Sequence, residues 1–187
     1  MKKDIRYNRT ESLIRDSFIE LANKKSIEFI SVTDICNKAK ISRNAFYAHY
    51  EDKYDFLNKI TELVLSELKT KIRDIPKEYD FSEALEFTTK TILSYFSINE
   101  AIISVLIKNN PLFWDYMTDV LEKIILLYIG TNEKNLVYAK YSSSALCGCI
   151  KQFILKKIPI SEEIFIKHIT EIANETNRFI KEKLCIQ

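Results

Sequence analysis

The sequence has 187 residues, of which 47% are hydrophobic, with 28 Lys and Arg against 26 Asp and Glu. This length fits one ordinary domain, or a small domain joined to a larger one, and the hydrophobic content excludes a largely disordered chain. Two glycines and three prolines are too few turn residues for a sheet-rich fold, which favours helices. No apolar run reaches the roughly 20 residues of a membrane span, and no apolar stretch follows the basic N-terminus as in a secretory signal. We therefore expect a cytoplasmic protein with no membrane partner.

Positive charge is concentrated at the N-terminal end. Residues 1–50 carry ten Lys and Arg against six Asp and Glu, whereas residues 51–187 carry eighteen against twenty. A basic unit on a neutral-to-acidic body favours a polyanionic partner at that end, although a surplus of this size also arises by chance.

The first part of the chain carries four helix signals. Asn8 with Glu11, and Ser31 with Asp34, are capping boxes, in which paired side chains satisfy free backbone N–H groups at a helix start. Ser42 caps a third, short helix, and apolar residues with helical spacing predict a fourth. The four predicted helices cover residues 8–25, 31–39, 43–50 and 52–73.

The second and third of these helices form a predicted helix-turn-helix. Only a short turn at Lys40 and Ile41 separates them, and the helix in front braces them. The second helix of such a pair lies in the DNA major groove, where Arg pairs well with guanine and Asn with adenine. Hydroxyls at helix starts, together with Tyr, His and Lys side chains, are suited to phosphate. The predicted DNA-binding residues are Ser31, Thr33, Ser42, Arg43, Asn44, Tyr47, His49 and Lys53.

Plainer roles are open for several of these residues. Tyr47 could cover the small core, and His49 could be a packing or surface histidine. Arg43 and Asn44 could lie at a solvated helix start, and Thr33 could face solvent only.

The stretch SVTDICNKAKISRNAFYAHYEDKYDF resembles the DNA-binding signature of the TetR/AcrR family of bacterial transcriptional regulators, over about residues 8–57. The matching positions are Ser42, the run Phe46-Tyr47-Ala48-His49-Tyr50 and the pair Asp52-Lys53. Lys40 departs from the family, which usually has glycine in the turn. The resemblance implies an all-α homodimer that binds a palindromic, double-stranded DNA operator. It also implies a C-terminal body that binds a ligand or a partner protein.

We predict an N-terminal DNA-binding domain over residues 1–53 and a helical ligand-binding and dimerisation domain over residues 54–187. Apolar stripes with helical spacing in the second domain bring the total to about nine helices. Such stripes are more often core than pocket, yet a body with this many aromatic side chains could hold a cavity. The predicted lining of a small-molecule pocket is Tyr95, Phe113, Trp114, Met117 and Tyr141.

The run SSSALCGCI, which begins at Ser142, is rich in small residues, and Gly148 costs about 1 kcal/mol inside a helix. Small residues let another backbone approach closely, either from a second subunit or from within the chain. We predict a homodimer built on the last two helices, over about residues 134–157 and 161–184. The predicted interface residues are Ala145, Gly148, Cys149, Phe165, Ile169 and Ile172.

Catalytic and metal motifs are missing from the sequence. Its two glycines exclude Gly-rich phosphate loops, and its two histidines lie far apart. The cysteines lack metal-site spacing, so we expect reduced thiols at Cys36, Cys147, Cys149 and Cys185. We therefore expect no enzyme, no cofactor and no metal. The predicted function is a repressor released by a small, mostly apolar effector; the alternative is a TetR-like adaptor or activator controlled by a protein partner.

Overall fold

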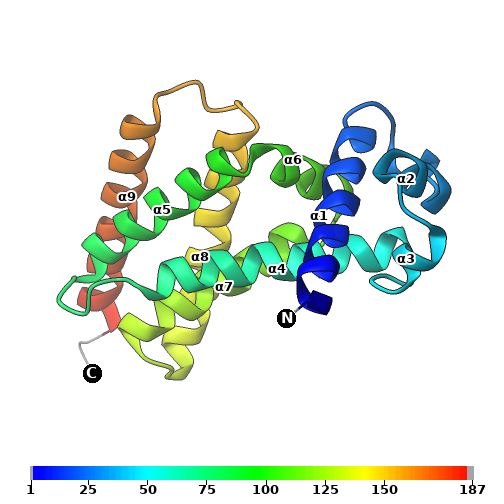
Figure 1. Cartoon of the computed structure of the whole chain (residues 1–187). Helices are drawn as coiled ribbons and strands as arrows, with labels where there is room; N and C mark the ends of the chain where they lie inside the picture. Colours follow the sequence, from blue (N-terminus) through cyan, green and yellow to red (C-terminus); the bar gives the residue numbers. More distant parts are fainter. Residues whose placement is uncertain (1, 185–187) are drawn as a thin grey trace. The chain divides into compact units, whose positions relative to one another are not determined.

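A computed structural model describes the backbone of residues 2–184 and the side chains of residues 7–178. Over this part of the chain every regular element is helical, which confirms the predicted all-α fold with about nine helices (Figure 1). The elements are α1 (Lys2–Ala22), η1 (Ile27–Phe29), α2 (Val32–Ala39), α3 (Arg43–Tyr47), α4 (Lys53–Arg73), α5 (Phe81–Ile98), α6 (Glu100–Asn109), α7 (Phe113–Ile129), α8 (Glu133–Ile154) and α9 (Glu162–Leu184).

The start of α1 corrects one prediction. The helix begins at Lys2, so Asn8 lies inside it and the predicted helix start at Asn8 is wrong. Lysine and arginine residues before Asn8 are good helix formers, and they let the helix continue toward the N-terminus. The other end of α1 is Ala22, and a short 3₁₀ helix, η1, occupies the expected link.

The chain packs into two compact units. The first, which we call the head, comprises Met1–Val64 and Asn99–Pro111; the second, the body, comprises Leu65–Ile98 and Leu112–Gln187. By packing, α6 therefore belongs to the head, and α4 contributes its first part to the head and its second part to the body. The predicted boundary at residue 53 divides the chain by function, which packing does not test, and it stays a prediction.

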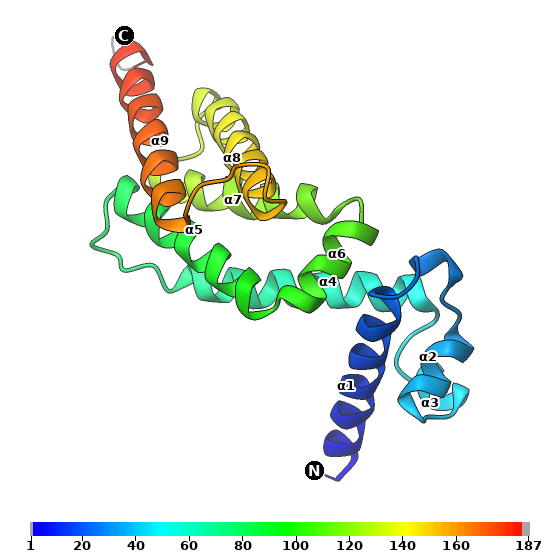
Figure 2. The ribbon, with the colours of Figure 1, turned by 90° about the horizontal axis from the view of Figure 1, so that it is seen from above.

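The core of the head contains a cluster of aromatic rings among aliphatic side chains. Phe18 of α1, Phe46 of α3 and Phe56 of α4 have no exposed surface. The ring centroids of Phe18 and Phe56 lie 4.7 Å apart, and Tyr50 meets Phe56 edge-on at 5.0 Å. Through this core α2 and α3 both pack against α1 (Figure 2).

A buried polar contact ties α6 to the head. Asn110 follows α6 and donates from Nδ2 to Thr61 Oγ1 at 2.9 Å, and the Thr61 hydroxyl donates to the Leu57 carbonyl at 2.7 Å. Both polar side chains are buried. Because α6 also packs against α1, a segment far along the chain completes the head.

The body is built on helix pairs. α7 and α8 lie side by side, and α5 packs against α9 (Figure 2). Phe153 of α8 stacks on Phe165 of α9, with ring centroids 4.3 Å apart, and joins the last two helices. The apolar stripes of the sequence thus form the interior of a C-terminal helical bundle, as predicted.

Candidate nucleic-acid interface

The helix α2 begins with a complete capping box. Ser31 Oγ accepts a hydrogen bond from the Asp34 N–H at 3.1 Å, and Asp34 Oδ2 accepts one from the Ser31 N–H at 2.9 Å. Lys25 Nζ lies 3.0 Å from the same carboxylate. The Ser31 backbone, and then Lys25, lower the pKa of Asp34 from 3.8 to about 2. The stabilisation from this carboxylate is therefore present above pH 3.8 and is lost as the pH falls toward 2.

The turn between α2 and α3 is left-handed at Lys40, where φ is 55° and ψ is 43°. The Ile41 N–H donates to the Cys36 carbonyl at 3.0 Å and closes the turn. A non-glycine residue in this region costs roughly 1 kcal/mol. The Lys40 side chain is exposed directly before α3. Lys40 is a candidate phosphate-binding residue that the sequence analysis missed, and the signal for it was a basic residue inside the helix-turn-helix turn.

The short helix α3 is fixed at its start and on its inner side. Ser42 Oγ accepts a hydrogen bond from the Ala45 N–H at 3.1 Å, which caps the helix. Phe46 turns inward and has no exposed surface. Its ring contacts those of Tyr47 and Tyr50, with centroids 5.7 Å away in each case. The orientation of α3 is therefore set by the core beneath it.

The outer side of α3 presents polar side chains. Arg43 and Asn44 are exposed, and Tyr47 keeps 47% of its surface exposed. The Arg43 guanidinium donates to the Tyr47 hydroxyl at 3.2 Å and lies 5.8 Å from the centre of its ring. The hydrogen bond to the Tyr47 hydroxyl raises the pKa of Arg43 above its ordinary value, so the guanidinium keeps its positive charge on this surface.

His49 lies inside the head. Its exposed fraction is 9%, and its ring stacks on Tyr7 with the centroids 3.8 Å apart. Nδ1 is buried without a hydrogen-bond partner in the part of the chain that is described. Burial lowers the pKa of His49, with Glu11 acting weakly the other way. The fold thus favours the neutral ring, and its contribution to stability declines as the pH falls below 6.5.

Lys53 is bound by the backbone of η1. Its Nζ donates to the carbonyls of Ile27 at 2.8 Å, Glu28 at 3.0 Å and Ile30 at 2.9 Å. An ammonium group has three donors, so these bonds use all of them. A phosphate contact at Lys53 has to compete with this intramolecular site.

The predicted DNA-binding residues therefore fall into two groups. His49 and Lys53 make contacts within the head, and the other six lie on its surface. The exposed members are Ser31, Thr33, Ser42, Arg43, Asn44 and Tyr47. Their roles toward DNA stay predictions.

The five residues predicted to line a pocket differ in their exposure to solvent. Phe113 and Met117 have no exposed surface, and Tyr95 is buried with its hydroxyl 2.7 Å from Glu67 Oε2. Tyr141 lies at the surface, with 64% of its area exposed. Trp114 lines a shallow hollow of about 450 Å³ between α7 and α8. A pocket formed by these five side chains stays a prediction.

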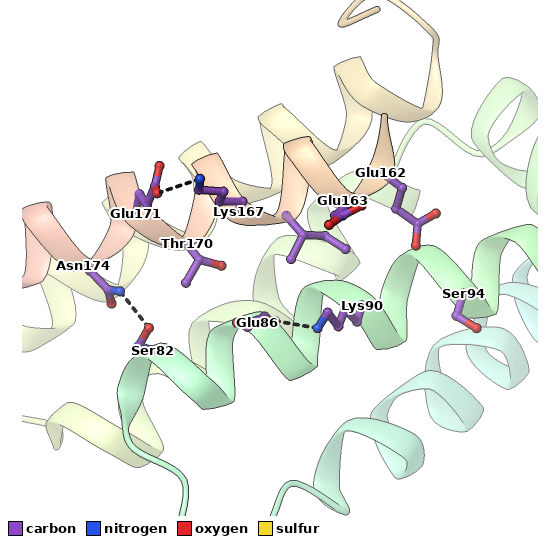
Figure 3. Close-up of a pocket in the computed structure, with 11 residues that line it drawn as sticks. Ser82, Glu86, Lys90, Ser94, Glu162, Glu163, Lys167, Thr170, Glu171 and Asn174 are labelled. Atoms are coloured by element: carbon purple, nitrogen blue, oxygen red, sulfur yellow. Dashed lines mark hydrogen bonds and ion pairs between the residues drawn. The ribbon is translucent and has the colours of Figure 1, made fainter. Parts of the chain in front are cut away.

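A larger groove, of about 920 Å³, runs between α5 and α9 (Figure 3). Its walls carry both charges, and several of its polar groups bind each other. Glu86 pairs with Lys90 at 2.5 Å, and Asn174 Nδ2 donates to Ser82 Oγ at 2.7 Å (Figure 3). Its lining has four glutamates against two lysines, so the groove carries a surplus of negative charge.

The predicted dimer residues lie in different environments. Ala145 and Gly148 are exposed on α8, and a Cβ added at Gly148 would meet no atom within 4 Å. Ile172 is exposed on α9, whereas Phe165 is buried against Phe153 within the chain. Cys149 and Ile169 are half-buried. The interface, Phe165 included, stays a prediction.

Among the described residues, no group of three or more His, Cys, Asp and Glu side chains is placed to hold a metal ion. Cys36 and Cys147 are buried free thiols and Cys149 is a half-buried one, while Cys185 lies outside the described residues. Burial raises the pKa of the Cys147 thiol. No single helix within residues 2–184 is long and apolar enough to cross a membrane; α5 and α6 meet that measure only when counted together.

No family model matches the chain, but individual proteins do. The transcriptional activator of the dhaKLM operon, DhaS, from Lactococcus lactis is 28% identical over 167 residues, which cover 83% of each chain. The uncharacterised HTH-type transcriptional regulator YxbF of Bacillus subtilis is 25% identical over 119 residues. That alignment covers 63% of this chain but only 31% of YxbF.

Solved structures share the fold over nearly the whole chain. A structure of the dihydroxyacetone kinase operon activator DhaS has a TM-score of 0.63 at 21% identity, covering 92% of this chain and 96% of the other. A TetR-family transcriptional regulator from Syntrophomonas wolfei has a TM-score of 0.64 at 18% identity, covering 92% and 94%.

Proposed function

We propose that this chain, which has the fold of TetR-family transcriptional regulators, is a sequence-specific DNA-binding regulator of transcription. The observation that carries the proposal is the two-sided character of α3. Phe46 anchors one side in the core, and Arg43 and Asn44 stand exposed on the other. A helix that reads bases in the major groove needs one side packed on the protein core. Its other side must expose hydrogen-bond donors and acceptors to the DNA.

The exposed residues divide between bases and phosphates. Arg43 and Asn44, in the first turn of α3, have the side chains that pair with guanine and adenine. Hydroxyls of Tyr47, Ser42 and Thr33 are suited to phosphate oxygens. The Ser31 hydroxyl donates to Asp34 Oδ2 at 2.9 Å, so a phosphate contact at Ser31 has to replace that bond. Lys40, exposed in the turn, adds a positive charge beside them.

Two further predicted residues are better supported as positioning residues. Lys53 holds η1 to the start of α4 through three carbonyls, and His49 stacks on Tyr7 of α1. Both contacts brace the helices around α3. A direct phosphate bond from either residue is the competing proposal, and the salt dependence of DNA binding separates the two.

We propose a homodimer as the DNA-binding form. Two recognition helices spaced about one DNA turn apart, roughly 34 Å, read a palindrome, and a two-fold dimer supplies them. Support comes from exposed apolar side chains on the last two helices, among them Val137 and Tyr141 on α8 and Ile164 and Ile172 on α9. Such side chains gain stability when a second surface covers them.

We further propose that the regulator is a cytoplasmic repressor released by a small effector bound in the body. An effector acts only if it prefers one of two states of the protein. The uninterrupted helix α4, shared by head and body, is the candidate carrier of that preference. The alternative is an adaptor or activator controlled by a protein partner; DhaS, to which the chain is similar, is an activator by name.

Selection of duplexes from a random-sequence pool tests the DNA-binding proposal. The purified protein is expected to enrich a palindrome at low salt. Asn44→Ala should weaken binding to that palindrome by about 1–3 kcal/mol and relax the preference at one base position. The matched control is Asn23→Ala, an exposed asparagine at the end of α1, which should leave the preference unchanged. Failure to enrich any sequence, with the protein folded, would refute DNA reading.

A further inference from the structure

A groove in the body joins an apolar floor to a rim of positive charge. It has a volume of about 570 Å³ and lies between the second part of α4, the segment that follows it, and α7. The apolar lining comprises Ile72, Ile75, Val120, Ile124, Leu127 and Tyr128. The charged lining comprises Lys69, Arg73, Lys77 and Lys123, and it includes no carboxylate.

These four cations have no counter-ion among the side chains of residues 7–178. None of the carboxylates among the described side chains lies within ion-pair distance of them, whereas Lys90 and Lys140 elsewhere in the body are paired. Lys69 and Arg73 stand four residues apart on α4, a spacing at which like charges repel. The groove therefore concentrates a positive potential that a bound anion would relieve.

Two of the apolar side chains that line the groove are exposed to solvent. Leu127 is 82% exposed, and Tyr128 is also exposed. An apolar group laid on Leu127 would remove its surface from water, which is favourable in proportion to the area covered. The volume lies within the roughly 300–1,000 Å³ of small-molecule sites.

We propose that this groove binds a small amphipathic anion, of the class of fatty carboxylates. The carboxylate would lie among Lys69, Arg73 and the neighbouring lysines, and the tail would lie on Ile124 and Leu127. The groove between α5 and α9, with its mixed and partly paired charges, offers no such selection. This inference rests on the proposed function only in naming the class of the effector; binding itself is measured without DNA.

Calorimetry with the full-length protein and three probes tests the charge and the tail separately. Dodecanoate, kept below its micelle concentration, is expected to bind with one site per chain. Dodecanol, which has the tail without the charge, should bind at least about tenfold more weakly, and so should butyrate, which has the charge with little tail. Raising the salt concentration should weaken dodecanoate binding, because the rim is exposed. Equal binding of dodecanoate and dodecanol, or many sites per chain, would overturn the proposal.

Variants locate the site. Lys69→Gln combined with Arg73→Gln, and separately Leu127→Ser, should each weaken dodecanoate binding about tenfold or more. Lys134→Gln and Ile98→Ser are the matched controls, because both residues are exposed in the body outside the groove, and neither should change the affinity. All these side chains are exposed, so folding is expected to persist, as circular dichroism would check. Unchanged affinity in the groove variants, or equal losses in the controls, would overturn the proposal.

Two more measurements distinguish a small anion from a second copy of the chain in the groove, and distinguish failure of the anion site from failure of the proposed function. If Leu127→Ser turned a dimer into a monomer by light scattering, a second copy would be the occupant and the proposal would be wrong. Operator affinity is then measured with and without dodecanoate. If the protein binds dodecanoate but selects no DNA sequence, the proposed anion site is supported and the proposed DNA-binding function is refuted. If it selects a DNA sequence but has no dodecanoate site, the DNA-binding function is supported and the anion site is refuted.

Discussion

The head and the body differ in the kinds of side chain found at their surfaces. In the head, the polar groups around the helix-turn-helix are engaged in local bonds, such as the capping box of Ser31 and the three carbonyls bound by Lys53. In the body, the large apolar side chains of Ile98, Leu127 and Val137 are highly exposed, whereas among the described residues of the head only Phe29 is exposed to that extent. A surface that reads DNA has to be rigid before contact, whereas a surface that binds a ligand or a subunit gains its stability on contact. Substitutions of the locally bonded polar groups in the head should therefore change folding, and substitutions of exposed apolar side chains in the body should change association.

The largest effect should come from Lys53→Met. The substitution keeps an apolar stem but leaves the carbonyls of Ile27, Glu28 and Ile30 without this donor, so the free energy of unfolding should fall by about 2–3 kcal/mol. Urea denaturation measures the loss. The control is Lys24→Met, an exposed lysine of the head, with an expected change within about 0.5 kcal/mol. Unchanged stability with a salt slope of DNA binding reduced by about one would instead support a phosphate contact at Lys53.

Asn110→Ala should rank next and tests whether α6 belongs to the head. The change removes the donor to the buried Thr61 hydroxyl, and we expect a loss of about 1–2 kcal/mol. Thr61→Val should partly rescue Asn110→Ala, since it removes the hydroxyl oxygen that has lost the Asn110 donor; the bond from this hydroxyl to the Leu57 carbonyl is lost with it, so the rescue is incomplete. Hydrogen exchange should show faster exchange in α6 and the adjoining part of α4. Strictly additive losses in the double variant would argue against the coupling.

Ser42→Ala should cost about 1 kcal/mol, the typical value of a lost N-cap. Because α3 has only five residues, its start is a large part of the helix, and DNA affinity should fall along with stability. Ser42→Asp restores a capping group while placing a negative charge beside the proposed phosphates. It should recover the melting temperature but not the DNA affinity. Recovery of both would remove Ser42 from the proposed interface.

The smallest effect on folding should come from Val137→Ser on α8. This side chain is 73% exposed, so the unfolding free energy of the monomer should change by no more than about 0.5 kcal/mol. The proposed dimer should instead dissociate more readily, by roughly tenfold, since a buried valine contributes about 1.5 kcal/mol or more. Analytical ultracentrifugation over a dilution series measures this. Leu13→Ser, on an exposed part of α1, should leave the dimer unchanged.

Local patterns predicted the helices well, and their one clear failure has a local cause. The caps at Ser31 and Ser42 form as expected, because cap and backbone lie three residues apart and depend on little else. Asn8 with Glu11 has the same pattern but does not start a helix. A capping side chain permits a helix to begin, yet it does not stop one that already runs through it.

The sequence correctly predicted the environment of site residues that depends on their own helix. It did not predict the environment of residues that depends on contacts with distant parts of the chain. Arg43 and Asn44 are exposed because Phe46 fixes the inner side of α3, a relation within one helix. His49 stacks on Tyr7, a residue of α1, and no spacing rule indicates such a pair. In the same way, apolar periodicity identified Phe113 as inward-facing but could not tell whether neighbours fill the space around it.

The left-handed turn at Lys40 has a consequence for how such a regulator changes over evolution. Glycine would adopt this conformation without strain, yet its freedom in the unfolded chain would cost roughly 0.4–1 kcal/mol. For lysine the two terms are reversed. The folded backbone is strained by about 1 kcal/mol, but the unfolded chain has less conformational entropy to lose on folding. The two nearly cancel, so stability exerts little selection between them. The turn of the helix-turn-helix is thus a position where a positive charge can be gained or lost in evolution without a change of fold. Such a change would alter the nonspecific affinity for DNA.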